Sequence, residues 1–154
     1  MTTAVDTNIL LDIVARESDF FETSREALWQ SANSGQLIIS EPVYAEIASR
    51  FPGASDLDAF LSETGVTLEP SSREALHRAG VAWRQYTREP RRFTCPECGA
   101  AQQVRCERCG SLVTRRQHVV ADFIIGAHAL VHAGRLLTRD RGYYAGYFPE
   151  LVLV

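Results

Sequence analysis

The sequence predicts an α/β protein with a mainly parallel sheet covered by helices on both faces. Short apolar runs that suit strands alternate with longer segments that carry apolar residues at helical spacing. Strands separated by helices usually pair in parallel, so this alternation indicates a three-layer α/β/α arrangement. The chain has 154 residues, of which 45% are hydrophobic and 23% are charged, which fits one globular domain and excludes a disordered or fibrous protein.

The N-terminal half contains three expected strands and four expected helices. The strands are residues 2–5, 36–40 and 66–68, and the helices are residues 8–15, 19–34, 40–50 and 55–64. Pro42 suits the first turn of the third helix. Gly35 and Gly65 stand where the second and fourth helices end.

The C-terminal half continues the alternation after a long helix that Ser71 or Ser72 caps and that runs through Arg88. A strongly apolar helix over residues 118–133, a strand over 135–138 and a final strand over 151–154 follow. A loop rich in Gly and Tyr is expected after Asp140. Three aromatic residues are expected in the core: Trp29, Trp83 and Phe123. Three more lie in this loop, where they either pack against the protein or stack on a base: Tyr143, Tyr144 and Tyr147.

Residues 91–115 interrupt this pattern, and they are predicted to form a small insertion between the two parts of the main domain, 1–90 and 116–154. The insertion contains paired C-x₂-C-G knuckles, Cys95 with Cys98 and Cys106 with Cys109, with seven residues between them. Four thiolates on two tight turns predict a structural tetrahedral zinc site. Iron is an alternative occupant of the same sulfurs, and disulfides are disfavoured in a cytoplasmic protein.

The charge distribution predicts a phosphate-bearing partner. The net charge is −3 and all 16 basic residues are Arg, yet seven Arg and three Glu between residues 88 and 116 give this segment a formal +4. Arginine binds phosphate in a bidentate manner, so RNA contact is expected here. The alternative is a solvated hairpin that contacts a protein. The arginines expected to hold RNA are Arg91, Arg92, Arg115 and Arg116.

Four carboxylates stand out by context: Asp6, Glu46, Asp122 and Asp140. Asp6 and Asp140 follow apolar strands, and the ends of parallel strands form the ligand crevice of an open sheet. Asp122 is the one charged residue in an apolar helix, where an unpaired charge is costly. A divalent cation such as Mg²⁺ or Mn²⁺ would compensate it. Alternatively, each acid is an isolated cap, turn or surface residue.

Four short segments resemble the motifs of PIN-domain ribonucleases, in the same order and at matching spacing outside residues 90–116. They are residues 4–10 (AVDTNIL), 39–46 (ISEPVYAE), 121–130 (ADFIIGAHAL) and 136–140 (LLTRD). Within that family the likeness is greatest to small VapC-type toxins of toxin–antitoxin pairs. The cysteine-containing insertion departs from these toxins.

The resemblance implies a metal-dependent endoribonuclease. Asp6, Glu46, Asp122 and Asp140 would match the acidic quartet of the family, where one or two Mg²⁺ or Mn²⁺ ions orient and activate water. Asn8 and Thr138 would orient the carboxylates or bound water. The resemblance also implies an antitoxin partner and a homodimer. Thr7 is a weaker candidate, because helix capping would explain it.

Two other functions remain open at this stage. One is an RNA-processing nuclease, since PIN and zinc-ribbon modules occur together in ribosome-maturation enzymes. The other is a non-catalytic, zinc-dependent module that binds RNA or protein. The sequence shows neither a membrane span nor a signal peptide, so a cytoplasmic location without a membrane partner is expected. His128 and His132 are interpreted as core or interface residues.

Overall fold

A five-stranded parallel sheet forms the centre of the molecule in the computed structural model, which describes residues 1–88, 93–94, 101–113 and 119–154. The strand order is β3-β2-β1-β8-β9, and every neighbouring pair is parallel. The strands are β1 (Thr2–Val5), β2 (Gln36–Ile39), β3 (Val66–Leu68), β8 (Arg135–Leu137) and β9 (Val152–Leu153). The predicted α/β class with a mainly parallel sheet is therefore confirmed.

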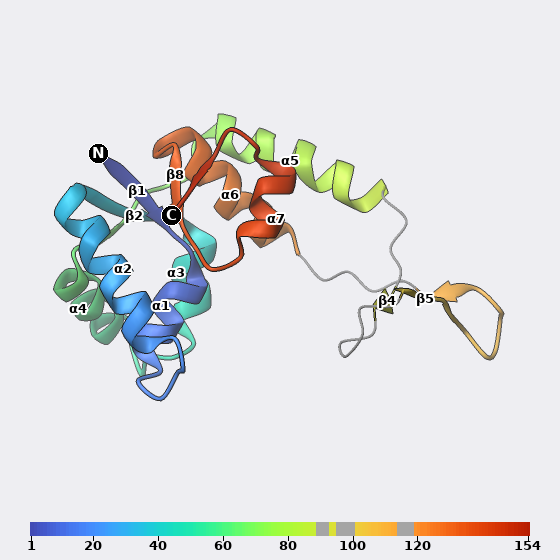
Figure 1. Ribbon diagram of the computed structural model, residues 1–154, viewed down its shortest axis with the longest axis horizontal. Coiled ribbons are helices and arrows are strands. Elements are labelled where there is room, and N and C mark those ends of the chain that lie inside the picture. The colour runs from blue at the N-terminus through green and yellow to red at the C-terminus, as the bar shows by residue number, and fades with distance from the viewer. Residues whose placement is uncertain (89–92, 95–100, 114–118) are drawn as a thin grey trace.

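Helices cover both faces of this sheet. Figure 1 shows α1, α2 and α4 on one side of the strands and α5, α6 and α7 on the other, with α3 near the middle of the molecule. The helices are α1 (Thr7–Val14), α2 (Phe21–Ser34), α3 (Glu41–Ala48), α4 (Ala54–Thr64), α5 (Arg73–Arg88), α6 (Val120–His132) and α7 (Arg141–Tyr147).

The strand order reverses at β1, which pairs with β2 on one side and with β8 on the other. From β1 the chain builds β2 and then β3 outward in one direction, and β8 and β9 extend the sheet in the other direction. In open α/β sheets, ligands bind beyond the carboxyl ends of the strands at such a reversal. Asp6 and Thr138 are the first residues after β1 and β8, so both lie at this point.

The core is built from the apolar strands and from the faces of helices that cover them. Val5, Ile39 and Leu136 are at most 1% exposed. Gly35 permits the close turn from α2 into β2, since its φ is +152° and a Cβ there would lie 1.8 Å from the Met1 carbonyl oxygen. This close approach brings β2 alongside β1.

The segment after Asp140 is a helix, so the prediction of a loop there was wrong. The Asp140 carboxylate accepts a hydrogen bond of 3.3 Å from the Tyr143 backbone N–H and caps α7. Tyr143 and Tyr144 are 9% and 2% exposed, which removes them as surfaces for stacking on a base. Gly126 on α6 leaves room for this packing, because a Cβ there would lie 2.4 Å from the Phe148 ring.

Trp29 is 62% exposed, so its prediction as a core residue was also wrong. α2 buries Leu28 instead, and its neighbour Trp29 points outward. Phe123 is fully buried and Trp83 is half-buried against it, with ring centroids 5.4 Å apart.

Within residues 91–115 the structure describes two short antiparallel pairs. They are β4 (Phe93–Thr94) with β5 (Ala101–Gln102), and β6 (Val104–Arg105) with β7 (Leu112–Val113). Several predicted site residues lie outside the described residues: Cys95, Cys98, Arg91, Arg92, Arg115 and Arg116. In the parts of the chain that the structure describes, no helix combines the length and the apolar character needed to cross a membrane.

Candidate active site

Asp6 is the most constrained of the predicted site residues. It follows β1 and caps α1, where its carboxylate accepts a hydrogen bond of 2.7 Å from the Thr7 backbone N–H. Its other oxygen accepts hydrogen bonds from the Asn8 amide, at 2.7 Å, and from the Thr138 hydroxyl, at 2.6 Å. Asp6 is 5% exposed. Its orientation is therefore fixed by groups from both β1–α1 and the end of β8.

The Thr138 hydroxyl connects Asp6 to Asp140. It donates to Asp6 and accepts hydrogen bonds from the Asn8 amide, at 3.2 Å, and from the Asp140 backbone N–H, at 3.0 Å. The structure thus places Asn8 and Thr138 against the carboxylate of Asp6. Asp140 follows two residues after Thr138 and is the N-cap of α7.

Glu46 reaches the same region from α3. The Thr7 hydroxyl donates a hydrogen bond to its carboxylate, although the two residues are 39 positions apart in sequence. Asp6, and not Thr7, is the N-cap of α1, so capping does not explain Thr7. Thr7 instead joins the residue after Asp6 to Glu46.

Asp122 lies in the first turn of α6 and is partly exposed. Its carboxylate accepts a hydrogen bond of 2.8 Å from the Val119 backbone N–H at the start of the helix. A negative charge is favourable at a helix N-terminus. The N-terminus of α6 therefore stabilises this carboxylate and orients it along the helix.

The Asp6 carboxylate is coupled electrostatically to those of Asp122 and Glu46. Burial raises the pKa of Asp6 from 3.8 to about 6, and the charges of Asp122 and Glu46 act in the same direction against the hydrogen bonds from Thr138 and Thr7. Burial also raises the pKa of the Tyr144 phenol, to which the charges of Asp6, Asp122 and Asp140 contribute. Tyr144 is thus a common neighbour of three of the predicted acids.

The donor set at this site suits a hard divalent cation, because it consists of carboxylate oxygens. No arginine of the described ranges forms an ion pair with Asp6, Glu46 or Asp140. The Asp6 carboxylate is accordingly buried without an ion pair to any residue that the structure describes. Among the residues that the structure describes, no three His, Cys, Asp or Glu side chains are gathered closely enough to enclose a metal ion.

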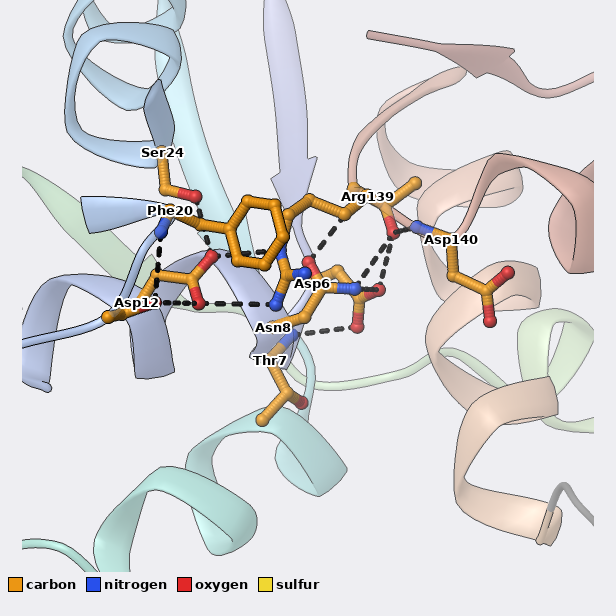
Figure 2. A network of polar contacts seen from close by, with 10 residues as sticks. Asp6, Thr7, Asn8, Asp12, Phe20, Ser24, Arg139 and Asp140 are labelled. Carbon is orange, nitrogen blue, oxygen red and sulfur yellow. Dashed lines mark hydrogen bonds and ion pairs between the residues drawn. The ribbon is translucent and has the colours of Figure 1, made fainter. Parts of the chain in front are cut away.

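An arginine brace, formed by Arg139 and Asp12, lies beside this site and was not predicted from the sequence. The guanidinium binds the Asp12 carboxylate through Nε at 2.8 Å and Nη2 at 3.1 Å, and it lies 4.1 Å from the centre of the Phe20 ring. Ser18 and Ser24 donate further hydrogen bonds to Asp12, at 3.0 and 2.7 Å. Figure 2 shows this network next to Asp6 and Asn8.

One signal in the sequence points to this brace. Asn8 and Asp12 are four residues apart on α1 and therefore share one helix face. Asn8 Oδ1 accepts a hydrogen bond of 3.3 Å from the Arg139 backbone N–H. Asn8 and Asp12, on successive turns of α1, therefore bind the backbone and the side chain of Arg139.

A second polar cluster joins α3, α6 and the segment before α5. Ser71 donates to the Glu41 carboxylate at 2.6 Å and lies 3.2 Å from His128 Nδ1. His128 and His132 stack with ring centroids 4.5 Å apart, and His132 Nε2 accepts a hydrogen bond from the Ser72 backbone N–H. Burial lowers the pKa of His128 to about 4, helped by the charge of His132. Both histidines therefore act in packing, as interpreted from the sequence.

Cys106 and Cys109 form one tight knuckle within the described residues. The Gly110 backbone N–H donates to the Cys106 carbonyl at 2.8 Å, and Gly110 has a φ of +70°, which favours glycine. The Cys109 thiol lies 3.4 Å from the Ser111 hydroxyl. This contact, together with other hydrogen bonds from Ser111 and Cys106, lowers the pKa of Cys109. A lowered pKa favours the thiolate, the form that binds metal.

The chain matches no protein-family model and no curated protein. Among solved structures it is similar to a chain in the crystal structure of VapBC2 from Rickettsia felis bound to a DNA fragment from their promoter. The TM-score is 0.57, the sequence identity is 19%, and the match covers 100% of this chain and 98% of that chain. The two chains share a fold. The likeness is consistent with the PIN-like architecture that the four sequence motifs imply.

Proposed function

We propose that this protein is a metal-dependent endoribonuclease that hydrolyses RNA phosphodiester bonds. The observation that carries the proposal is the buried carboxylate of Asp6, which lies at the reversal point of the sheet without an ion pair among the described residues. Its raised pKa reflects burial and the charges of Asp122 and Glu46. A site that concentrates negative charge in this way favours a divalent cation over a neutral ligand.

Mg²⁺ or Mn²⁺ would be held by Asp6, Glu46, Asp122 and Asp140, whose carboxylates would have to draw closer together around the ion than they lie in the structure. When bound, the cation supplies charge compensation for the phosphodiester and activation of a water molecule. The protein's own task is to orient the carboxylates. Thr138 and Asn8 fix the plane of the Asp6 carboxylate, and Thr7 holds Glu46. Neighbours of this kind keep a ligand in one orientation and so increase metal affinity.

We further propose that the insertion binds structural zinc through Cys95, Cys98, Cys106 and Cys109. The knuckle geometry at Cys106 and Cys109 and the lowered pKa of Cys109 support a thiolate site. Four thiolates leave no open position for substrate, so this metal would fold the insertion without taking part in hydrolysis. Arg91, Arg92, Arg115 and Arg116 would then hold RNA phosphates near it.

A protein partner is also proposed, in the form of an antitoxin. The structural neighbour is a VapBC2 complex, which supports this assignment. The chain also has an apolar groove of about 630 Å³ between α1, α2 and α4, and its lining includes Ile13, Phe51 and Phe60. Ile13, Phe51 and Phe60 are partly exposed, and Arg16 and Glu63 complete the lining; partly apolar surface with charged residues around it is typical of protein–protein contacts. An antitoxin seated there would distinguish a toxin from an RNA-processing nuclease.

Cleavage assays test the proposed function. Wild type and Asp122→Asn are incubated with RNA in Mn²⁺ or in EDTA. We expect cleavage by wild type with Mn²⁺ and none in EDTA or by the variant. Asp56→Asn is the matched control, since Asp56 is an exposed acid in the first turn of another helix, α4. Equal cleavage by wild type and Asp122→Asn would reject the acidic site, and binding of RNA without any cleavage would favour a non-catalytic module.

A further inference from the structure

The exposed face of α5 carries a stripe of positive charge that, apart from Arg88, lies outside the basic segment 88–116. The stripe consists of Arg73, Arg84 and Arg88, with the uncharged polar His77 in the same row, and all four side chains are exposed. They are separated by four, seven and four residues, so on a helix of 3.6 residues per turn they fall within an arc of about 60°. From Arg73 to Arg88 the stripe is about 22 Å long, at 1.5 Å per residue.

The stripe lies opposite the packed face of the helix. α5 buries Ala75, Ala79, Ala82 and Tyr86, and these residues point away from the stripe by about half a turn. Packing on α6 therefore does not account for the choice of arginine on the outer face.

Among the residues that the structure describes, acidic side chains do not pair with the arginines of the stripe. Glu74 is the one acid in α5, and it pairs at 3.2 Å with Arg78, which lies outside the stripe. Within the part of the chain that the structure describes, no ion pair involves Arg73, Arg84 or Arg88. The exposed face of α2 differs, because there Arg25 pairs with Glu22 at 2.6 Å.

Gly80, on the same face of α5 as the stripe, is a second, independent observation. Gly80 lies between His77 and Arg84, and a Cβ built there would meet no atom within 4 Å. Glycine is among the least favourable residues inside a helix, and here the protein's own packing does not require it. A missing side chain at this place lets a ligand approach the helix backbone closely.

The stripe leads toward the acidic end of the molecule. α5 and α6 run antiparallel, since the Ser72 backbone N–H bonds His132 near one end and the Tyr86 ring lies 5.2 Å from the Phe123 ring near the other. The end of α5 that carries Arg88 is thus the end nearer the start of α6, where Asp122 lies. In Figure 1, α5 crosses α6 and its C-terminal turns project beyond it.

We propose that this stripe of α5 binds the phosphate backbone of an RNA strand and directs the strand toward the acidic edge of the sheet. The inference rests on the proposed ribonuclease function and identifies the surface that holds its substrate. A linear row of arginines matches a linear row of phosphates, and arginine binds phosphate in a bidentate manner. An acidic site repels RNA, so a separate cationic surface is needed to retain it.

Fluorescence anisotropy with a short labelled single-stranded RNA tests the stripe in EDTA, where metal-dependent cleavage is absent. For the double variant Arg84→Gln and Arg88→Gln, we expect affinity to fall on the order of tenfold and the salt slope of log K to decrease by about 1.4, as two lost phosphate contacts require. The matched control is Arg25→Gln on α2, which also removes exposed positive charge. It is expected to bind RNA as wild type does.

Gly80→Gln provides the second variant, and it is expected to act on stability and binding in opposite directions. Glutamine favours the helix more than glycine, so the thermal unfolding midpoint should rise, whereas RNA affinity should fall because the side chain blocks close approach. Wild-type affinity and salt slope in the double arginine variant would overturn the proposal. An equal loss of RNA affinity in Arg25→Gln would also overturn it. So would a variant that loses affinity for duplex DNA but binds single-stranded RNA as wild type does. These binding results stand whether or not the protein cleaves RNA in Mn²⁺.

Discussion

Arg139 holds Asp12 in a bidentate ion pair across the carboxyl edge of the sheet. The two residues are 127 positions apart in sequence, and Arg139 stands between Thr138, which binds Asp6, and Asp140, which caps α7. The Asp12 side chain is 7% exposed and that of Arg139 is 38% exposed. The pair therefore ties the segment that carries Asp140 to the helix that follows Asp6.

The brace makes a measurable contribution to stability. Arg139→Gln leaves the buried Asp12 carboxylate without its cation, and we expect the free energy of unfolding to fall by about 1–2 kcal/mol, since partial exposure weakens the pair. Urea unfolding of the two single variants, Arg139→Gln and Asp12→Asn, and of the double variant gives the coupling energy. Arg141→Gln is the control, because Arg141 lies two residues after Arg139 and is exposed. Additive effects in the double variant would show that the pair is not coupled.

The titration of Asp6 predicts how stability depends on pH. Its pKa is raised in the folded protein from 3.8 to about 6, so the folded state binds this proton more tightly than the unfolded state. In EDTA, the Asp6 contribution to stability is present below about pH 4 and is lost as pH rises to about 6, on the order of 3 kcal/mol in total. The difference between wild type and Asp6→Asn in urea unfolding across this range isolates the effect. A constant difference would contradict it.

Thr7 is expected to act through Glu46. Thr7→Val removes the hydroxyl that donates to the Glu46 carboxylate while keeping the branched shape of the side chain. We expect Mn²⁺ affinity and cleavage rate to fall about 10- to 100-fold, as for other residues that orient metal ligands. Thr7→Ser keeps the hydroxyl and should restore most of both. If Thr7→Val binds Mn²⁺ like wild type, the contact does not support the site.

Zinc content tests the cysteine module. We expect elemental analysis to find about one zinc per chain, because four thiolates form one tetrahedral site. Cys106→Ser should lose the metal, with proteolysis between residues 89 and 118 increasing while the circular dichroism of the parallel sheet and its helices is retained. Ser111→Ala is a control, since it removes the partner of the Cys109 thiol without removing a ligand. Unchanged zinc in Cys106→Ser would exclude this residue as a ligand.

Sequence patterns predicted the strands well and one helix poorly. β1 and β3 coincide with the predicted residues 2–5 and 66–68, because short apolar runs bounded by turn residues describe buried strands directly. α7 escaped prediction because Gly142 and Gly146 give its seven residues the composition of a loop. Its stability comes from the Asp140 cap and from tyrosines packed on α6, and neither contribution appears in local propensity.

The sequence by itself determined the layered α/β architecture and the placement of acids after apolar strands, because both follow from local periodicity and from the polarity of strand ends. Only the tertiary structure decided which groups meet there. The bonds of Thr138 to Asp6, Thr7 to Glu46 and Arg139 to Asp12 join residues 132, 39 and 127 positions apart. Periodicity in the sequence describes which residues share a face of one helix or strand. These contacts depend instead on the order of the strands in the sheet. The partners of each carboxylate could therefore be known only from the tertiary structure.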